Sequence, residues 1–265
     1  MRIILSPAKK MRVDTDSLAP RSLPSCLQET EGLLYWLQNL NQTELQSLWK
    51  CNDKLLALNV DRLSHMDLHR NLTPAILAYE GIAYQYMAPS VFEEGQFDYV
   101  EEHLRILSAF YGVLRPLDGV TPYRLEMGAK TGEIATELTK ELPASLYEYW
   151  GSRIYDVVID GDKDQKAGHT IINLASKEYS KCLEKFLRPE DRYITITFCE
   201  MSGEKMVTKG TYAKMARGEM VRFMAEHKIE NAEEIKRFDR MGFIYREQLS
   251  SETESLKGLG SNLRY

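Results

Sequence analysis

Short apolar runs that end at polar residues constrain the fold of this chain more than any other feature. The run "RIIL" at residues 2–5 is β-branched and is stopped at once by Ser6 and Pro7, which predicts a buried strand. A second run, "HTIINLAS" at 169–176, also passes into polar residues. The stretch "RYITITFCEM" at 192–201 alternates with a period of two, so we expect one face of this strand to be buried.

Other parts of the chain have the spacing of helices. Leucines recur at roughly helical intervals over residues 26–50, which predicts two helices broken near Asn39–Asn41, with Asn41 or Thr43 as the N-cap of the second. A third helix is expected to start near Cys51–Asp53 and to end before Pro74. Further helices are expected at 96–111, 145–160 and 211–227, and β-structure at 75–87 and 241–247.

These elements alternate irregularly, without an internal repeat or a long linker. We therefore predict an α/β fold with α+β-like character, in which a mixed β-sheet is covered by helices in a single compact domain spanning residues 1–265. A purely parallel sheet is not expected, because regular βαβ units do not follow the helical N-terminal third. The Ser-rich segment 248–265 is expected to be a less ordered polar tail.

The composition excludes several classes of protein. With 34 Lys and Arg against 39 Asp and Glu, the formal net charge is −5 and the pI is about 5.7. This balance excludes a wholly basic nucleic-acid-binding protein but allows a local basic cleft. No apolar run approaches the length of a membrane span, and the N-terminal run is too short for a secretory signal. The four cysteines form no C-x-x-C pair and no zinc-like cluster, so we expect a cytoplasmic protein with reduced thiols, no metal and no cofactor.

The segment "RPLDGVTPYRLEMG", Arg115–Gly128, is unusually charged for a connection. If residues 123–127 are extended, Arg124 and Glu126 project from one face and Tyr123 from the other. Arg124 and Glu126 can then hold each other in position. We predict that Arg124 binds a ligand and that Tyr123 and Glu126 are candidates for acid–base chemistry; the alternative is a structural ion pair at a sheet edge.

Polar residues also follow two of the expected strands. Ser6 and Lys9 come directly after the first strand, and Asn173 and Ser176 lie at the polar end of the 169–176 run. Ligands of open α/β sheets usually bind at this carboxyl edge. We predict that Ser6, Lys9 and Ser176 bind a ligand and that Lys9 and Asn173 are candidate catalytic residues. Ser176 taken alone is better explained as a helix cap, whereas the amide of Asn173 needs hydrogen-bond partners.

Two cations lie close together on the helix expected at 211–227. Lys214 and Arg217 are neighbours at i and i+3 with no acidic residue between them, a pattern that suits a phosphate or carboxylate ligand. The alternative is a solvated helix flank. We predict that both residues bind the same ligand as Arg124.

The stretch "HLRILSAFYGVLRPLDG" at 103–119 allows a helix-hairpin-helix interpretation. Such an element binds the nucleic-acid backbone through hairpin N–H groups and nearby cations. Gly112 and Arg115 would supply these features. The match rests on one glycine in an apolar segment, which is a common arrangement.

The chain as a whole resembles the YaaA family of peroxide stress proteins. The resemblance extends almost from end to end, and two departures from it are that Lys10 stands where the family usually has Thr and that "REQLSSETES" only loosely echoes the family's C-terminal segment. The segments that carry it are "LSPAK" at 5–9, "NDKL" at 52–55, "AILAYEG" at 75–81, "LRILSAFYGVLRPLDGVTPYRLEMG" at 104–128, "LYEYWG" at 146–151, "INLASKEY" at 172–179 and "YAKMARGEMVRFM" at 212–224.

The resemblance implies a compact single-domain α/β fold of unusual topology with a positively charged cleft. It also implies a cytosolic role in surviving hydrogen peroxide, by limiting free iron and protecting DNA. The family is associated with binding duplex and distorted DNA, with a helix-hairpin-helix-like element near 104–118. It implies no settled enzymatic activity.

Three hypotheses follow for the function of the chain. The first is a DNA-binding stress protein that limits iron-dependent oxidative damage, whose affinity should fall steeply with salt. The second is an enzyme that acts on a small anionic ligand resembling a nucleotide or nucleobase, which would use a tyrosine and a glutamate as well as cations. The third is that the charged residues form structural ion pairs and the protein acts through partners. A concave pocket that joins the candidate residues would favour the second.

Overall fold

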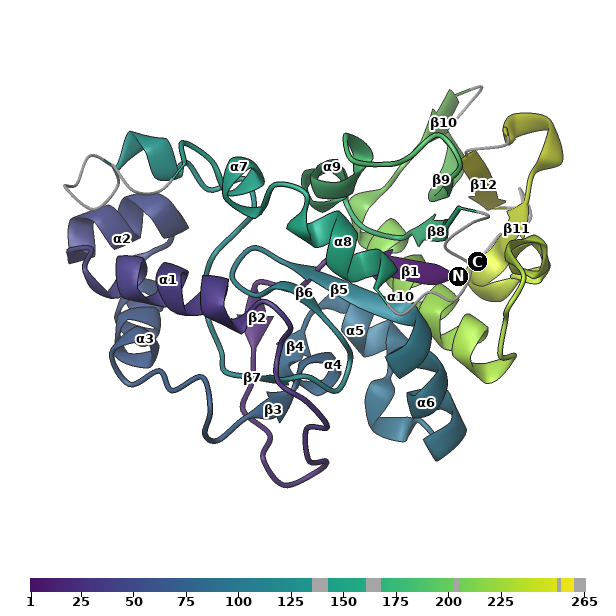
Figure 1. Cartoon of the computed structure of the whole chain (residues 1–265). Helices are drawn as coiled ribbons and strands as arrows, with labels where there is room; N and C mark the ends of the chain where they lie inside the picture. Colours follow the sequence, from purple (N-terminus) through teal and green to yellow (C-terminus); the bar gives the residue numbers. More distant parts are fainter. Residues whose placement is uncertain (135–142, 161–167, 203–204, 252–253, 260–265) are drawn as a thin grey trace.

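The sheet at the centre of the molecule is mixed, and its middle strands are parallel. The computed structural model describes residues 1–134, 143–160, 168–202, 205–251 and 254–259 (Figure 1). The strand order is β11-β12-β9-β8-β1-β5-β6, with β10 paired to β9 beside this path. Neighbours from β12 to β5 are parallel, whereas β6, β10 and β11 are antiparallel to their partners. These strands are β1 Arg2–Leu5, β5 Leu104–Ser108, β6 Gly112–Leu114, β8 Thr170–Asn173, β9 Arg192–Ser202, β10 Lys205–Val207, β11 Phe243–Tyr245 and β12 Glu254–Leu259.

The first strand lies in the middle of the sheet, as its apolar sequence predicts. Ile3 is in register with Leu104 of β5 on one side and with Ile172 of β8 on the other. All four residues of β1 are buried, because a parallel strand at the centre of a sheet is covered on both faces. The α/β class and the mixed sheet covered by helices are therefore confirmed.

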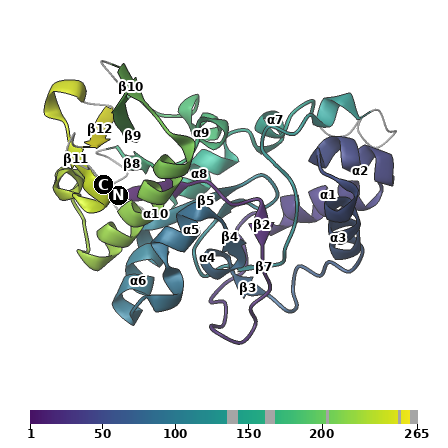
Figure 2. The ribbon, with the colours of Figure 1, turned by 180° about the vertical axis from the view of Figure 1, so that it is seen from behind.

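Helices cover both faces of the sheet. The helix α8 packs on β1 and β6 at the front of Figure 1, and α10 packs on β9 at the back, which faces the viewer in Figure 2. The helix α10 also lies directly on α5: a Cβ at Gly218 would lie 1.9 Å from the carbonyl oxygen of Ala83, so only glycine allows this approach. The helices of this part of the molecule are α5 Ile82–Met87, α6 Glu94–His103, α7 Leu146–Trp150, α8 Arg153–Ile159, α9 Lys177–Glu184 and α10 Gly210–Glu226.

Three helices form the end of the molecule that lies farthest from β11 (Figure 1). They are α1 Leu27–Gln38, α2 Gln42–Trp49 and α3 Asp53–Ser64. The helical pair predicted for 26–50 is confirmed, and Asn41 is the N-cap of α2. Its side chain accepts from Glu44 N while the Glu44 side chain accepts from Asn41 N, which is a capping box.

Shorter elements complete the chain. Two small antiparallel ribbons pair β2 Lys10–Met11 with β4 Tyr79–Glu80, and β3 Thr73–Pro74 with β7 Gly119–Val120. The remaining short helices are α4 Ala75–Ala78 and the 3₁₀ turns η1 Pro89–Val91, η2 Thr131–Glu133, η4 Ala232–Arg237, η5 Arg240–Gly242 and η6 Glu247–Leu249. None of the helices within the described ranges combines the length and the apolar character needed to cross a bilayer.

Two stretches have a different secondary structure from the predicted one. Residues 75–87, expected as β-structure, are mainly helical as α4 and α5, with the two residues of β4 and Gly81 between them. The helix expected at 96–111 ends at His103, and Leu104–Ser108 forms β5 instead. For β5, tertiary contacts override local preference, because the strand pairs with β1 and β6 and is buried at every position.

The helix-hairpin-helix interpretation of 103–119 is therefore wrong. The segment is the end of α6 followed by a β-hairpin, in which β5 and β6 are antiparallel and Ser108 pairs with Gly112. No α-helix follows within residues 115–134. The helix expected at 145–160 is also divided, because Gly151 at φ 51° separates α7 from α8.

The C-terminal strand expected at 241–247 is β11. Within the segment 248–265, residues Glu254–Leu259 form β12 between β9 and β11, so this part of the expected tail is a strand. Residues 252–253 and 260–265 lie outside the described part of the chain.

Candidate functional site

A single pocket joins most of the residues selected from the sequence. It has a volume of about 400 Å³ and lies where β1 and β8 end, between the turn after β1, the segment before α5, the extended segment 123–126 and α10. Its position agrees with the rule that ligands of open α/β sheets bind at the carboxyl edge. The predicted residues that line it are Ser6, Lys9, Tyr123, Arg124, Glu126, Ser176, Lys214 and Arg217. Their roles in binding or catalysis stay predictions.

The floor of the pocket is fixed by hydrogen bonds between the ends of β1 and β8. Ser6 Oγ donates to Ser176 Oγ at 3.2 Å and accepts from Ser176 N at 2.8 Å. Tyr84 Oη donates to the Ser6 carbonyl oxygen at 3.0 Å, which ties α5 to the same turn. Ser176 is the N-cap residue of α9, yet its side chain makes no capping hydrogen bond. The hydroxyl of Ser176 therefore faces Ser6 and the pocket instead of the first turn of its own helix.

The extended segment 123–127 alternates as its sequence predicts. Tyr123, Leu125 and Met127 are buried, whereas Arg124 and Glu126 are partly exposed where they line the pocket. Glu126 Oε2 lies 2.8 Å from Lys9 Nζ, and Glu126 Oε1 lies 4.0 Å from Arg124 Nη2. The closer ion pair thus joins Glu126 to the turn after β1, and the pair with Arg124 is at the outer limit for such a contact.

The cations of α10 lie on the opposite wall of the pocket. Lys214 is exposed, whereas Arg217 is largely covered, and its Nε is buried without a hydrogen-bond partner. Burial lowers the pKa of Arg217 from its ordinary value, because desolvation disfavours the charged guanidinium. Neither residue has an ion-pair partner within the described ranges of the chain. Arg124 Nε is likewise buried and unpaired.

The carboxylates that line the pocket are already engaged. Glu126 pairs with Lys9, and Glu80 pairs with Lys10 at 3.0 Å. Glu178 Oε1 accepts from Gly128 N at 2.9 Å. Among the described charged side chains of the pocket wall, those without an ion-pair or hydrogen-bond partner are Lys214 and Arg217, and both are donors, which suits a ligand rich in acceptor oxygens.

A buried cluster of three hydroxyl groups adjoins the pocket, and two of its members, Ser108 and Tyr79, were not selected from the sequence. Tyr123 Oη lies 2.7 Å from Ser108 Oγ and 2.9 Å from Tyr79 Oη. Burial raises the pKa of Tyr123 to about 12, although the hydrogen bonds from Ser108 and Tyr79 act in the opposite direction. Burial also raises the pKa of Tyr79. Tyr123 is thus a neutral phenol at pH 7 and can act there as a donor.

Three of the predicted residues do not line the pocket. The amide of Asn173 serves the end of β8: its Oδ1 accepts from Ala175 N at 2.9 Å and its Nδ2 donates to Thr195 Oγ1 at 3.2 Å. Gly112 is buried against the ring of Trp150. Arg115 is exposed outside the pocket, and its backbone N–H donates to Asp118 Oδ2 at 2.8 Å. Each of these residues has a structural role instead: Asn173 at the end of a strand, Gly112 in a hairpin and Arg115 in a turn.

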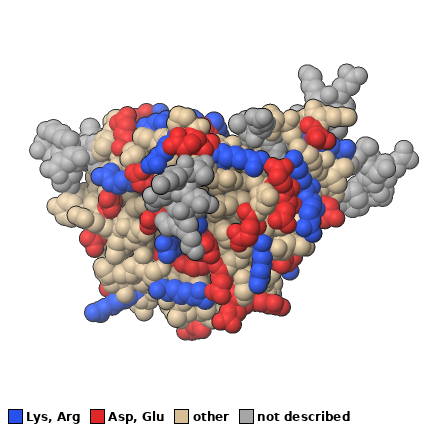
Figure 3. All heavy atoms as spheres, turned by 45° about the vertical axis from the view of Figure 1, so that its right-hand side comes forward, with Lys and Arg blue, Asp and Glu red and all other residues tan. Residues whose placement is uncertain are grey.

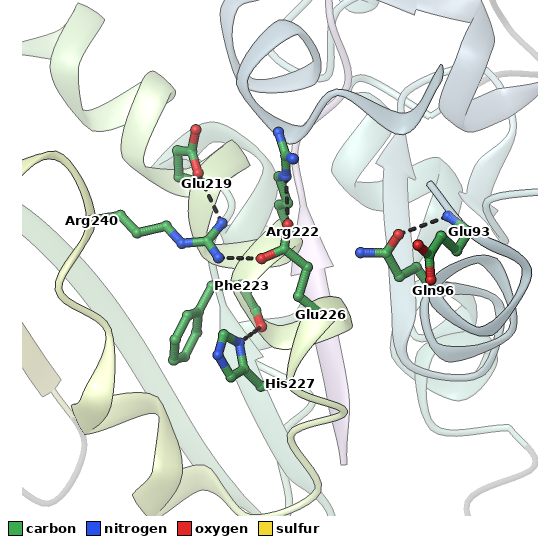
Figure 4. A network of polar contacts seen from close by, with 8 residues as sticks. All are labelled: Glu93, Gln96, Glu219, Arg222, Phe223, Glu226, His227 and Arg240. Carbon is green, nitrogen blue, oxygen red and sulfur yellow. Dashed lines mark hydrogen bonds and ion pairs between the residues drawn. The ribbon is translucent and has the colours of Figure 1, made fainter. Parts of the chain in front are cut away.

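The outer half of α10 is held by a network of ion pairs (Figure 4). Arg240 Nη1 donates to Glu219 Oε2 at 3.2 Å, and Arg240 Nη2 donates to Glu226. Arg222 Nε donates to Glu226 Oε1 at 2.7 Å. The guanidinium of Arg240 also lies 5.5 Å from the ring centre of Phe223. These contacts fix the helix that carries Lys214 and Arg217.

Charges elsewhere on the surface are mixed. Lys and Arg side chains alternate with Asp and Glu over the face of the molecule drawn in Figure 3, so that face carries no broad region of one sign. Within the described ranges, no group of three or more His, Cys, Asp or Glu side chains is arranged to hold a metal ion.

Comparison with known proteins assigns the chain to a family. The family described as peroxide stress protein YaaA matches residues 1–249. The chain belongs to this family. A protein of Agathobacter rectalis named "UPF0246 protein" is 61% identical over 254 residues, which cover 96% of this chain and 97% of that protein. Proteins of the same name from Lachnoclostridium phytofermentans and Pediococcus pentosaceus are 51% and 48% identical, over 100% and 95% of this chain and 99% and 95% of theirs.

Proposed function

We propose that the chain binds and acts on a small anionic ligand, resembling a nucleotide or a nucleobase, in the pocket between β1, β8 and α10. The pocket would serve the peroxide-stress role of the family, in the cytoplasm. The observation that carries this proposal is the convergence of Arg124, Lys214 and Arg217 on a cavity of about 400 Å³, a volume typical of small-molecule sites.

The position of Arg217 supports a binding role over a structural one. A partly buried guanidinium without a counter-ion destabilises the folded protein relative to an apolar side chain of similar size. Arg217 has no partner in the described part of the chain and its Nε is buried. A bound anion would supply the missing charge. The third hypothesis, that these residues are structural ion pairs, does not account for Arg217.

Arg217→Met tests this function directly. We expect the variant to unfold at the same or a higher urea concentration than the wild type, while binding is lost. The measurement is isothermal titration calorimetry with orotate, adenosine monophosphate and uridine monophosphate as probes, at one salt concentration. Arg237→Met is the matched control, because Arg237 is exposed outside the pocket and pairs with Glu234. A wild type that binds none of the probes, or an Arg217→Met variant that binds them equally well, contradicts the proposal.

A second candidate function is DNA binding that limits iron-dependent oxidative damage. The exposure of Lys9 and Lys10, whose side chains are 68% and 78% exposed, favours it. Together with Lys214 they form a cationic border at the mouth of the same pocket. In this function the border would contact phosphates of the DNA backbone. The test is protection of plasmid DNA from nicking by ferrous iron and peroxide, with a border-neutralised variant that should protect less.

A further inference from the structure

The hydroxyl cluster beside the pocket contains one more O–H donor than it has hydrogen bonds in which to place it. Ser108 Oγ accepts from the backbone N–H groups of Phe110 at 3.2 Å and Tyr111 at 2.9 Å. A hydroxyl has one proton and two lone pairs, so both lone pairs of Ser108 are occupied. Its own proton must therefore be donated to Tyr123 Oη, which lies 2.7 Å away.

The remaining bond, between Tyr79 and Tyr123, uses one further proton. Three hydroxyl protons are present, and two hydrogen bonds join the three oxygens. One O–H therefore has no acceptor within the described part of the chain. An unsatisfied buried donor is unfavourable, so an acceptor from outside the cluster is expected.

Only Tyr123 among the three residues lines the pocket. If Tyr79 donates to Tyr123 Oη, this oxygen accepts two hydrogen bonds and its own proton is free. The free donor then faces the pocket that Arg124 also lines, although the two side chains leave the extended segment on opposite faces. Other groups of the pocket without a partner in the described part of the chain, the Nε groups of Arg124 and Arg217 and the ammonium of Lys214, are also donors.

We infer that Tyr123 donates its phenolic proton to an acceptor oxygen of the pocket's ligand, and that this ligand therefore carries a carbonyl or oxyanion oxygen beside its anionic group. The inference rests on the proposed function. When the proton is transferred, the Tyr123 O–H bond breaks and an O–H bond forms on the ligand. The phenolate keeps the electron pair and is stabilised by the hydroxyls of Ser108 and Tyr79, and water entering the open pocket returns the proton. The raised pKa of Tyr123 keeps the group protonated at neutral pH, as a donor must be.

The test compares two tyrosines of the same cluster. Tyr123→Phe should weaken the binding of orotate or the nucleotide probes at least about tenfold, the effect of one hydrogen bond to a charged group. Tyr79→Phe keeps the Tyr123 proton free and should change binding less than about threefold. Tyr123→Phe loses both hydrogen bonds of the cluster and Tyr79→Phe loses one, so a purely structural role predicts a larger loss of stability for Tyr123→Phe but no difference in binding between the two variants.

A spectroscopic measurement follows the same proton. In protein labelled with ¹³C at tyrosine ζ, the resonance that disappears in Tyr123→Phe is that of Tyr123. It should shift on saturation with the tightest probe, while the resonance of the exposed Tyr35 on α1 should not. If the probes bind the wild type and Tyr123→Phe alike, the inference is overturned and the proposed function stands. If no probe binds the wild type, both are overturned.

Discussion

Gly112 begins β6 with φ at 71°, directly under the ring of Trp150. A Cβ at this position would lie 2.8 Å from Trp150 Cζ3, within the distance at which atoms overlap. We therefore predict that Gly112→Ala lowers the free energy of unfolding by roughly 2–3 kcal/mol, from backbone strain and the displaced ring together.

Urea unfolding measures this loss. Gly210→Ala is the matched control: a Cβ at Gly210, in the first turn of α10, meets nothing within 4 Å, so the substitution should be neutral or slightly stabilising. Equal midpoints for the two variants would show that the hairpin does not require glycine.

Asp118 should make the stability of the protein depend on pH between about 4 and 6. Its carboxylate is buried and accepts from Ser22 Oγ at 2.6 Å and from Arg115 N at 2.8 Å. Burial raises its pKa from 3.8 to about 6. Between these values the folded state binds a proton that the unfolded state has lost, so stability falls as pH rises through about 6.

The predicted change for Asp118 is up to about 3 kcal/mol of unfolding free energy, since each pKa unit corresponds to about 1.4 kcal/mol. The measurement is urea unfolding at pH 4, 5, 6 and 7 for the wild type and Asp118→Asn. The variant cannot titrate at this position, so its stability relative to the wild type should rise with pH over this interval. A constant difference would mean that Asp118 titrates normally.

The sequence predicts those pocket residues that belong to a pattern of neighbouring positions, such as an alternating extended segment or the residues after a strand. Arg124 and Glu126 share a face because an extended segment alternates, and Ser6 and Lys9 follow a strand that ends at a proline. The partners of Tyr123 have no such pattern. Ser108 and Tyr79 come from segments 15 and 44 residues away, so only the folded chain brings the three hydroxyls together.

At the scale of elements, α10 combines two tasks along its length. Lys214 and Arg217 reach the pocket, while the turns that follow are tied to η5 by Arg240 (Figure 4). We predict that Arg240→Met lowers the free energy of unfolding by about 1–2 kcal/mol at pH 7, because two partly buried carboxylates lose their shared partner. Arg237→Met, which breaks an exposed pair on η4, should change it by less than about 0.5 kcal/mol.

The effect of Arg240 should weaken in acid. Burial acts to raise the pKa of Glu226, but hydrogen bonds from Arg240 and Arg222 outweigh it, and the pKa lies below 4.5. A carboxylate with a lowered pKa stabilises the fold fully above its unfolded value and loses this effect as pH falls through its folded value. The difference in thermal unfolding between the wild type and Arg240→Met should therefore shrink as pH falls below 4.5. A difference that does not change with pH would assign the effect of Arg240 to its packing on Phe223.

Elements whose apolar residues recur at a regular spacing were predictable from the sequence. Elements whose secondary structure depends on pairing with distant strands were not. The alternation in β9 and the apolar face of α10 follow from side chains within each element. The β5 strand does not: "LRILS" continues the helical pattern of α6, and it becomes a strand because β1 and β6 supply its hydrogen bonds on both sides. Residues 75–87 are mainly helical although their composition favours strands, and α5 packs along α10.

At the scale of the whole molecule, an acidic protein carries more cations than carboxylates around its pocket. The net charge is −5, yet the lining contains Lys9, Lys10, Arg124, Lys214 and Arg217 against Glu80, Glu126 and Glu178. This separation of charge is compatible with both candidate functions, and their dependence on salt distinguishes them. A small ligand engages one or two charges, whereas a DNA duplex releases counterions in proportion to the phosphates contacted.

If DNA binds across the border of Lys9, Lys10 and Lys214, about three phosphates are neutralised, and affinity should fall roughly 40-fold between 50 and 200 mM salt. The measurement is fluorescence anisotropy of a labelled duplex. Replacing the three border lysines by glutamine should flatten this dependence.

The control replaces Lys181, Lys185 and Lys228, which are exposed elsewhere, and so changes the net charge by the same amount. Because the two triple variants have equal net charge, a difference in slope reports where the DNA lies, and equal slopes would exclude the pocket mouth as the place of contact. Orotate or nucleotide binding should fall much less with salt and should depend on Arg217 in either case, since its guanidinium lies inside the cavity.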